Sequence, residues 1–424
     1  MEAVRTRQSP LPECAPPLLP SPTAPHRIPV SPDFSALAAN PLFVDPALDD
    51  ATVRSAMPRL LADCQAAGVS DLHLSAQARP FVRRHGQIHY LTEKPLPADV
   101  AEAANLTLLD EKQFKQLQET SDLELALALG HDQRFRACIT LHKWGVSGAY
   151  RIVPPRARPL DELGFPDTAV LRRLLAFHNG LILITGPVNS GKTATLTAMV
   201  DEVNRTRSDH IITVEDPIEY VVPSASCIVT QRQVGDHTKT FATALRAALR
   251  QDPDVMAIGE LRDLETINIA ITAAETGHLV LGTMHTADAT STLSRLLDVF
   301  PPSQQAQIRA MVSESLRGIV CQRLLPALDG GTALACELLV ANLAVANLIR
   351  ENKLQNLPSV LETGMREGMV SMDSSVLELF KAGRISEEVA LANIGNRALR
   401  SLLQNAAHPP APEPAVERKR FGLF

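Results

Sequence analysis

The sequence predicts an α/β protein in which a parallel sheet, covered by helices on both faces, follows a smaller α+β domain. From about residue 166, strand-length apolar runs alternate with helical patterns. These runs are almost continuously hydrophobic, which is typical of parallel strands buried on both faces. A chain of 424 residues exceeds one ordinary core, so two folded domains are expected. The prolines of 154–165 forbid a continuous helix or central strand and mark a linker between the domains.

The smaller domain is expected over residues 47–153, where a helical pattern precedes short strand patterns with further helices between them. The helical ranges are 51–68, 98–108 and 110–119, and the strand ranges are 71–76, 79–91, 134–144 and 147–154.

The larger domain is expected over residues 166–405. Because helical patterns separate its apolar runs, its strands should return to one sheet in parallel. The segment from about 303 to 405 reads as mostly helical. The strand ranges are 180–186, 210–216, 255–260 and 278–286, and the helical ranges between them are 190–206 and 241–251.

Both ends of the chain are rich in proline and small residues and lack the periodic apolar content that builds a core. Residues 1–46 and 406–424 are therefore predicted to be a disordered arm and a disordered tail. The tail closes with the basic, aromatic run ERKRFGLF (417–424). This run is a candidate contact for a membrane surface or a partner, and an ordinary solvated tail is the alternative.

The composition excludes several classes of protein. A formal net charge of −6 argues against a dedicated nucleic-acid-binding surface. No apolar run approaches the ~20 residues that cross a bilayer, and the N-terminus lacks an apolar signal core, so we expect a cytoplasmic protein. The six cysteines form no C-x-x-C pair, so reduced thiols are expected rather than a zinc site or a disulfide framework.

The stretch TGPVNSGKT at 185–193 matches the phosphate-binding pattern G-x-x-x-x-G-K-[ST], with a predicted strand before it and a helix after it. In such a loop, backbone N–H groups and the helix N-terminus converge on anionic oxygens. Lys192 is expected at the β- and γ-phosphates of ATP, and the Thr193 hydroxyl at Mg²⁺. The expected nucleotide-binding residues of this segment are Gly186, Pro187, Val188, Asn189, Ser190, Gly191, Lys192, Thr193 and Ala194.

Carboxylates follow two of the predicted strands, at the edge where an open parallel sheet holds its ligand. Glu215, Asp216 and Glu219 come after one strand, and Glu260 ends another. Gly259 stands where many nucleotide sites have an aspartate. Together with the phosphate loop, these positions predict a Mg²⁺-nucleotide site, and the alternative is that the carboxylates only solubilise strand ends.

His278 and His285 flank one apolar strand. Such a pair could contact the terminal phosphate or carry its state to a neighbouring subunit, and ordinary core or surface roles are the alternative. An odd spacing along a strand places the two side chains on opposite faces, which argues against a shared zinc ion.

Assembled, these stretches resemble the secretion-ATPase superfamily of motor NTPases, and most closely the type IV pilus retraction ATPases of the PilT and PilU type. The resemblance covers residues from about 52 to 400. SDLHLS (70–75) resembles the start of the family's N-terminal domain, and EDPIEY (215–220) its Asp box. LRQDPDVMAIGELRDLET (249–266) is similar to its Walker B region, AAETGHLVLGTMHT (273–286) to its His box, and ANLIRENK (346–353) to its C-terminal motif.

The resemblance implies roles for single residues. Lys192 and Thr193 match the Walker A residues that hold phosphate and magnesium. Glu219 matches the glutamate that activates the attacking water, and Glu260 the glutamate that helps to hold Mg²⁺. The remaining matches are the His-box residues His278 and His285, and the arginines Arg134, Arg136 and Arg151, which in the superfamily reach the phosphates when the domains close.

The resemblance also implies an architecture and partners. The N-terminal domain would be PAS-like, the C-terminal domain RecA-like, and the assembly a homo-hexameric ring with ATP between the domains. Such a ring docks on an inner-membrane pilus platform protein at the cytoplasmic face of the membrane and drives pilin subunits back into it, which powers twitching motility. A paralogous retraction ATPase is a further possible partner, and no nucleic acid is expected.

Three positions depart from the family pattern. Asn189 replaces a glycine of the phosphate loop, and asparagine is among the few other residues that tolerate a positive φ. Trp144 and Ala346 each stand where the family has an arginine. These departures leave open an accessory role of the PilU type.

Other functions remain as alternatives at this point. Pilus-assembly and type II secretion ATPases of the superfamily carry a zinc insertion with two C-x-x-C pairs, and this sequence has none. A non-hydrolysing, nucleotide-binding regulator would not need the intact Lys192, Glu219 and Glu260. A DNA-translocating helicase would be expected to show a basic composition.

Overall fold

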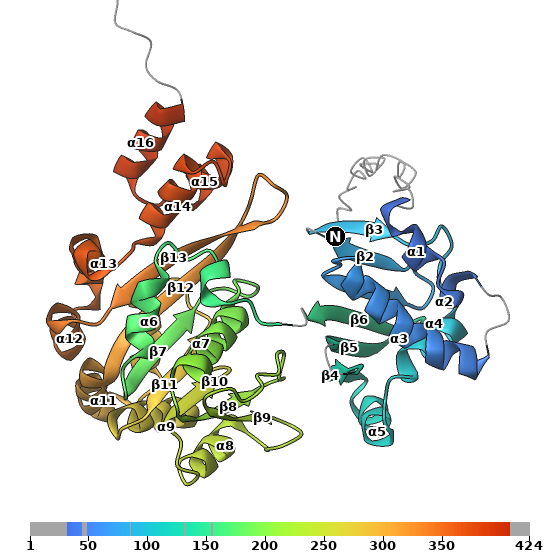
Figure 1. Ribbon diagram of the computed structural model, residues 1–424, viewed down its shortest axis with the longest axis horizontal. Helices are drawn as coiled ribbons and strands as arrows, with labels where there is room; N and C mark the ends of the chain where they lie inside the picture. The colour runs from blue at the N-terminus through green and yellow to red at the C-terminus, as the bar shows by residue number, and fades with distance from the viewer. Residues whose placement is uncertain (1–31, 45–48, 85, 131–132, 154–155, 408–424) are drawn as a thin grey trace, which may run out of the picture.

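The computed structural model describes residues 32–407, apart from 45–48, 85, 131–132 and 154–155. These residues form two sheets, each with its own helices and core (Figure 1). The smaller sheet has the strand order β3-β2-β1-β6-β5-β4, and the larger has the order β13-β12-β7-β11-β10-β8-β9. This arrangement confirms the predicted α/β class, with a smaller α+β domain before the larger one.

The N-terminal domain is an antiparallel sheet with helices packed on one face. Its elements are η1 (Pro32–Phe34), α1 (Ser35–Ala38), α2 (Pro41–Val44), α3 (Asp50–Ala66), β1 (Asp71–Ser75), β2 (Phe81–Arg84), β3 (Gln87–Tyr90), α4 (Ala98–Leu106), α5 (Glu111–Thr120), β4 (Asp122–Ala128), β5 (Arg134–His142) and β6 (Gly145–Val153).

The alternation along β5 and β6 divides the side chains between the two faces of this sheet. Phe135 and Tyr150 point into the core, where each is at most 1% exposed. The intervening positions carry arginines, and Arg136 lies directly opposite Arg151 in the β5–β6 pairing. Because alternate side chains share a face, Arg134 is on this same face as Arg136. The sheet therefore presents an arginine-bearing face away from its helices, on which Asp71 and Glu124 pair with Arg151 and Arg136.

The predicted disordered arm over 1–46 is wrong for its last part. Residues 32–44 form η1, α1 and α2, whose Phe34, Leu37 and Leu42 are at most 3% exposed in the core of the N-terminal domain. Burial of these three apolar side chains stabilises the segment against the domain, although its surroundings in the sequence are proline-rich. Residues 1–31 lie outside the described part of the chain.

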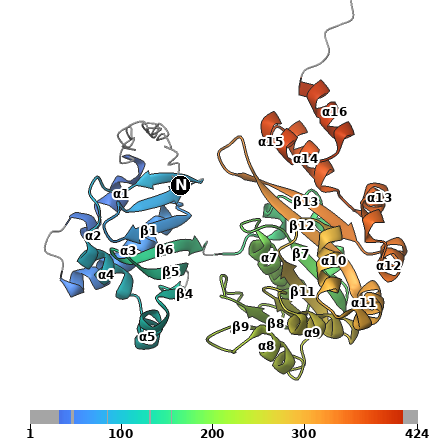
Figure 2. The same ribbon diagram turned by 180° about the vertical axis from the view of Figure 1, so that it is seen from behind.

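The larger domain continues to the end of the described residues (Figures 1 and 2). Its elements are η2 (Leu160–Glu162), α6 (Thr168–Leu175), β7 (Gly180–Thr185), α7 (Lys192–Thr206), β8 (His210–Glu215), β9 (Ile228–Gln233), α8 (Phe241–Ala248), β10 (Val255–Ile258), α9 (Leu264–Glu275), β11 (Leu279–Met284), α10 (Ala289–Asp298), α11 (Pro302–Ser315), β12 (Leu316–Pro326), β13 (Thr332–Val340), α12 (Leu343–Arg350), η3 (Leu354–Asn356), α13 (Leu357–Thr363), η4 (Gly364–Glu367), α14 (Met372–Lys381), α15 (Glu387–Asn393) and α16 (Arg397–Ala407).

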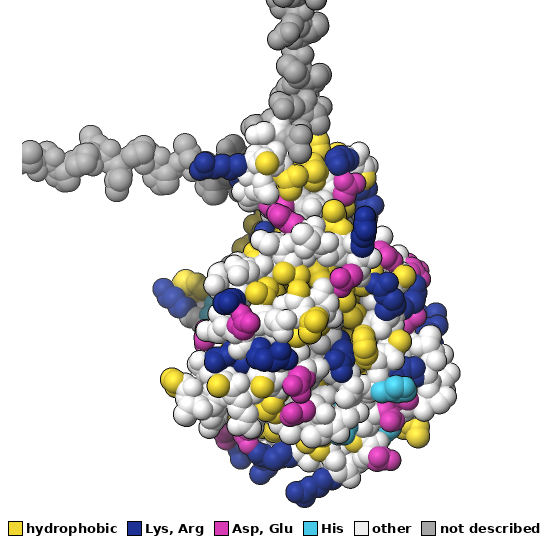
Figure 3. All heavy atoms as spheres, turned by 90° about the vertical axis from the view of Figure 1, so that its left-hand side faces the viewer, with side chains coloured by type: hydrophobic (Ala, Val, Ile, Leu, Met, Phe, Trp, Pro, Cys, Tyr) yellow, Lys and Arg dark blue, Asp and Glu magenta, His cyan; other side chains and the backbone are white. Residues whose placement is uncertain are grey.

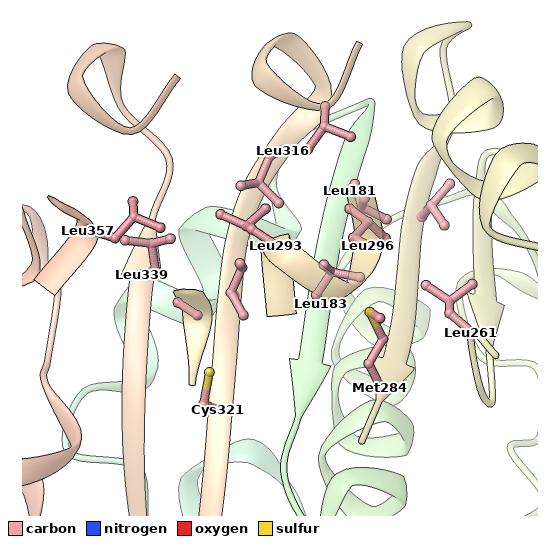
Figure 4. Packing of buried hydrophobic residues seen from close by; sticks show 14 of the residues in the cluster. Leu181, Leu183, Leu261, Met284, Leu293, Leu296, Leu316, Cys321, Leu339 and Leu357 are labelled. Atoms are coloured by element: carbon pink, nitrogen blue, oxygen red, sulfur yellow. The ribbon is translucent and has the colours of Figure 1, made fainter. Parts of the chain in front are cut away.

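Two cores lie on opposite faces of the larger sheet. Alternate residues of β7 face each side, so Leu181 and Leu183 join the core with α8–α14, and Ile182 and Ile184 join the core with α6 and α7. Figure 4 shows the first of these cores, in which Leu293 lies among leucines of the sheet. Burial of both faces explains why the strands read as unbroken apolar runs.

The prediction that 303–405 is mostly helical misses two strands. β12 pairs parallel with β7, and β13 pairs antiparallel with β12, so the sheet is not wholly parallel. The predicted linker is also shorter than expected, since Leu160 is 1% exposed in the core with α6 and α7. The tail prediction for 406–424 falls almost entirely outside the described residues, beyond the end of α16.

The surface of the larger domain mixes residue types. Figure 3 shows acidic, basic and apolar side chains interspersed on the side that carries α11–α13. Within the described ranges, no helix combines the length and the hydrophobicity that a bilayer crossing requires.

Candidate nucleotide-binding site

The loop between β7 and α7 is built from backbone conformations that few residues adopt. Gly186 has a φ of +150°, Asn189 of +65° and Gly191 of +88°, and Gly191 is the N-cap residue of α7. A side chain on Gly186 would collide with the backbone oxygen of Gln322 on β12. The loop therefore turns tightly and leads into the N-terminus of α7, where free N–H groups favour an anion.

Lys192 is folded back over this loop. Its Nζ donates hydrogen bonds to the carbonyl oxygens of Gly186, at 2.9 Å, and Pro187, at 2.8 Å. Burial lowers the pKa of Lys192, and the nearby carboxylate of Glu260 opposes that shift. The ammonium group is thus held over the loop, within reach of the charge of Glu260 at the end of β10, which is separated from β7 by β11.

Glu260 follows β10, and its carboxylate contacts the side chains of an arginine and a histidine. Its Oε1 lies 2.5 Å from Nε of Arg262 and 3.2 Å from Nε2 of His285. Burial raises the pKa of Glu260, but the hydrogen bond from Arg262 and the charge of His285 outweigh it, so the pKa falls below its usual value. An aspartate in place of Gly259 would be crowded, because a Cβ there would lie 3.2 Å from two backbone atoms, Glu215 Cα and Val214 O.

Glu219 approaches the loop from the segment after β8. Burial raises the pKa of its carboxyl, while the charges of Arg136 and Arg151 and a hydrogen bond from the Thr193 side chain lower it. Glu215 also borders the cavity, but it is buried, and its Oε1 accepts hydrogen bonds from Thr213 at 2.6 Å and Gln231 at 3.0 Å. Of the two glutamates in EDPIEY, Glu219 is therefore the one available to a ligand.

The arginine-bearing face of the N-terminal sheet borders the site from the other domain. Arg136 Nη1 lies 3.8 Å from Oε1 of Glu219, and its Nη2 lies 3.3 Å from Oε2 of Glu124. Arg151 donates from Nη1 to Asn189 Oδ1 at 3.1 Å. Like charges placed directly opposite each other in a sheet repel, so this pair of arginines is suited to an anion between the domains.

These groups surround one cavity of about 450 Å³, which lies in the range of small-ligand pockets. Beside the loop, Ser190 Oγ and Gln322 Oε1 are buried and have no hydrogen-bond partner within the described part of the chain. The cavity is lined by Arg136, Arg151, Val188, Asn189, Gly191, Lys192, Thr193, Ala194, Leu196, Glu215, Asp216, Pro217, Glu219, Tyr220, Phe241, Gly259, Glu260, Arg262, Thr283 and His285.

Gly186, Pro187 and Ser190 of the loop do not line this cavity themselves, and two predicted site residues outside the loop are not brought to it. His278 precedes β11 and binds Ala273 through Nδ1, whereas His285 follows the strand. A strand of this length spans about 20 Å, so the two histidines lie at opposite ends of β11. Arg134 does not line the cavity either, although its charge reaches Glu215.

The structure also adds residues that the motifs did not single out. Arg262 pairs with Glu260, and Tyr220 and Phe241 line the cavity. The only signal for Arg262 was its place two residues after Glu260, which does not distinguish it from a surface arginine. Across the described residues, no group of three or more histidine, cysteine or acidic side chains is arranged to hold a metal by itself.

Comparison with known proteins places the chain in a family. A family model described as "Type II/IV secretion system protein" matches residues 46–367. The type IV pilus retraction ATPase PilT of Pseudomonas aeruginosa is 41% identical over 331 residues, which are 78% of this chain and 96% of that protein. The type IV pilus ATPase PilU of the same organism is 34% identical over 327 residues, 77% of this chain and 85% of that protein.

A solved structure agrees with these sequence matches. The crystal structure of the pilus retraction motor PilT with bound ADP has a TM-score of 0.73 and 42% identity, covering 80% of this chain and 97% of that chain. The family and the fold predicted from the motifs are thus confirmed. The chain belongs to the type II/IV secretion system protein family and, within it, to the type IV pilus retraction ATPases.

Proposed function

We propose that this chain is a motor ATPase that hydrolyses ATP to power type IV pilus retraction, with its active site in the cavity between the two domains. One observation carries the proposal. One cavity of about 450 Å³ is lined by the loop lysine Lys192, by Glu219 and Glu260, and by Arg136 and Arg151 of the other domain. Nucleotide hydrolysis at this place would act on both domains at once.

Phosphoryl transfer to water needs alignment and neutralisation of spreading negative charge more than covalent chemistry. Lys192, now bonded to Gly186 and Pro187, would turn its ammonium to the phosphates, which are stronger acceptors than carbonyls. Arg136 and Arg151 would add charge from the N-terminal sheet. Glu219, whose pKa is raised by burial, would accept a proton from the attacking water and orient it.

The residues present also fit a magnesium ion. Mg²⁺ is usually bound in proteins by one or two carboxylates, waters and the substrate phosphates. Glu260 and Thr193 line the same cavity, and the depressed pKa of Glu260 keeps its carboxylate ionised at neutral pH. When bound with the nucleotide, the ion would neutralise charge on the β- and γ-phosphate oxygens.

A second cavity, of about 500 Å³, borders the other side of the loop and would take the nucleoside. It combines Tyr220 and Leu324, which can pack against a base, with Arg384 and the unpaired oxygen of Gln322. Ser190 and Thr195 line it as well, so a nucleotide could lie across the loop, with its base in this cavity and its phosphates in the first.

The mechanical work of retraction would come from closure of the N-terminal domain against the larger domain. ATP bridging the loop and the two arginines favours the closed pairing, and product release allows the open one. As the family resemblance implies, we infer a homo-hexamer at the cytoplasmic face of the inner membrane, acting on a pilus platform protein. We also infer that the chain acts together with a paralogous retraction ATPase. We do not expect it to bind nucleic acid.

The chemical step is tested by Glu219→Gln, which keeps the shape of the side chain and removes the base. Turnover of the purified full chain, measured as phosphate release, should fall by about 10²–10⁴-fold. The Kd for a fluorescent ATP analogue should stay within a few-fold of the native value. The matched control is Glu362→Gln on the exposed surface of α13, which should change neither quantity. Near-native turnover in Glu219→Gln would remove the base from the mechanism.

The cellular role is tested by deleting the gene and counting surface pili and twitching cells. A retraction motor predicts hyperpiliation without twitching, restored by the native gene and not by the Glu219→Gln allele. Loss of pili on deletion would instead indicate an assembly ATPase, and normal pili with normal twitching would contradict the motor role.

A further inference from the structure

The phosphate loop is joined to the N-terminal sheet through the side chain of Asn189. This residue has a φ of +65°, a conformation that glycine adopts freely and that costs other residues conformational energy. Its Oδ1 accepts a hydrogen bond from Nη1 of Arg151 at 3.1 Å. A glycine would adopt the same backbone conformation but would offer no acceptor to the other domain.

We propose that Asn189 is a positioning residue that holds the Arg151 guanidinium at the phosphate loop, so that the N-terminal domain is in place before ATP arrives. The proposal rests on the proposed function of the cavity and deepens it. The hydrogen bond between Arg151 and Asn189 would couple the position of the N-terminal domain to nucleotide binding on the larger domain.

The surroundings of Arg151 explain why a second partner is needed. Arg151 and Arg136 lie opposite each other in the β5–β6 pairing and repel. Asp71 on β1 holds one edge of the Arg151 guanidinium, with Oδ1 at 3.1 Å from Nε. This leaves the Nη groups to find partners in the other domain, where Asn189 meets Nη1.

The chemistry of the acceptor matters as much as its place. An amide oxygen is neutral, so it orients the guanidinium without cancelling its charge. A carboxylate at the same place would neutralise Arg151 and repel the phosphates of ATP. Asn189 thus orders a long side chain beforehand and leaves its charge free for the ligand, which lowers the entropy cost of binding.

A double-mutant cycle tests the proposal with Asn189→Gly, Arg151→Ala and the combined variant, each as the full chain. Asn189→Gly keeps the backbone conformation and removes the acceptor. We expect it to raise the Kd for a fluorescent ATP analogue, and the KM for ATP, about 3–10-fold with kcat within about twofold. In the Arg151→Ala background, the same change should alter the Kd by less than about twofold.

A second substitution separates orientation from charge. Asn189→Asp keeps an acceptor and adds a negative charge, so it should weaken ATP binding more than Asn189→Gly does. Thermal denaturation of each variant checks that it is folded as the native chain is. Equal effects of Asn189→Gly in both backgrounds, or an Asn189→Asp variant that binds ATP as tightly as the native chain, would overturn the inference. Failure of the native chain itself to bind ATP would instead overturn the proposed function.

Discussion

Replacing Gly186 by alanine should weaken nucleotide binding far more than it destabilises the fold. Gly186 has a φ of +150°, and an added Cβ would lie under 3.0 Å from the backbone oxygen of Gln322 and from Ser190 Oγ. The backbone of β12 is buried between two packed strands and cannot yield as a side chain can. The loop must therefore move, and it carries the acceptor of Lys192 with it.

The size of the effect follows from that movement. Carbon atoms in contact sit about 3.5–4.0 Å apart, so relief requires a shift on the order of 1 Å. Misplacement by about 1 Å in a site that depends on alignment costs about 10²-fold. We therefore expect the Kd for an ATP analogue to rise about 100-fold, or about 2.8 kcal/mol at 1.4 kcal/mol for each tenfold change.

The assay compares Gly186→Ala with Gly330→Ala, which lies in the turn between β12 and β13. Gly330 has a φ of +83°, and a Cβ there would meet no atom within 4 Å. Both variants incur backbone strain, which is about 1–2 kcal/mol for the left-handed Gly330, but only Gly186→Ala disturbs the phosphate loop. Fluorescence titration should show native affinity for Gly330→Ala. A Kd for Gly186→Ala within about threefold of native would refute the steric argument.

Three further predictions concern the charge of Glu219 and the core of the N-terminal domain. Glu219 must be ionised to accept a proton, and burial raises its pKa, so turnover should fall on acidification at a higher pH than an ordinary glutamate would give. Because the charge of Arg136 lowers that pKa, Arg136→Ala should move the acidic limb of the pH–rate profile to still higher pH, and an unmoved limb would count against the contact. In the N-terminal core, the Tyr150 hydroxyl donates to Asn105 Oδ1 at 2.6 Å. Tyr150→Phe leaves that buried oxygen unpaired and should lower the free energy of unfolding by about 1–3 kcal/mol in urea denaturation, with native stability as the contrary result.

The sequence predicts the central part of this site because its chemistry is local. A strand, a tight glycine loop and a helix with one lysine are adjacent in the chain, and strand ends of a parallel sheet meet at one edge. Lys192, Thr193 and Glu260 therefore fall where the pattern places them. Strand alternation likewise puts Arg136 and Arg151 on the open face of their sheet.

Other features depend on information that periodicity does not hold. β12 and β13 are buried on both faces, and such apolar runs cannot be told from buried helix by their spacing. His278 and His285 flank one strand in the structure as in the sequence, so only His285, at the carboxyl end of β11, lines the cavity. The short helices of residues 32–44 could not be predicted, because the segment is short and lies next to a proline-rich stretch. Phe34 and its neighbours contact apolar side chains only in the folded N-terminal core.

The roles of Arg262 and Asn189 could be found only in three dimensions. Arg262 reaches back to the carboxylate of Glu260, and Asn189 reaches across to an arginine from a different domain. Neither contact joins residues whose spacing has a recognised meaning in sequence. Contacts between domains are set by the final packing, so they escape any pattern read along one segment.

The most direct test of the proposed active site measures phosphate release from Mg²⁺-ATP by the purified full chain and by Lys192→Ala. Lys381→Ala on the exposed surface of α14 is the matched control, because it removes a lysine far from the loop in sequence. We expect steady turnover for the native chain and the control, and none above background for Lys192→Ala. Equal turnover in all three proteins would contradict a site built around the loop lysine.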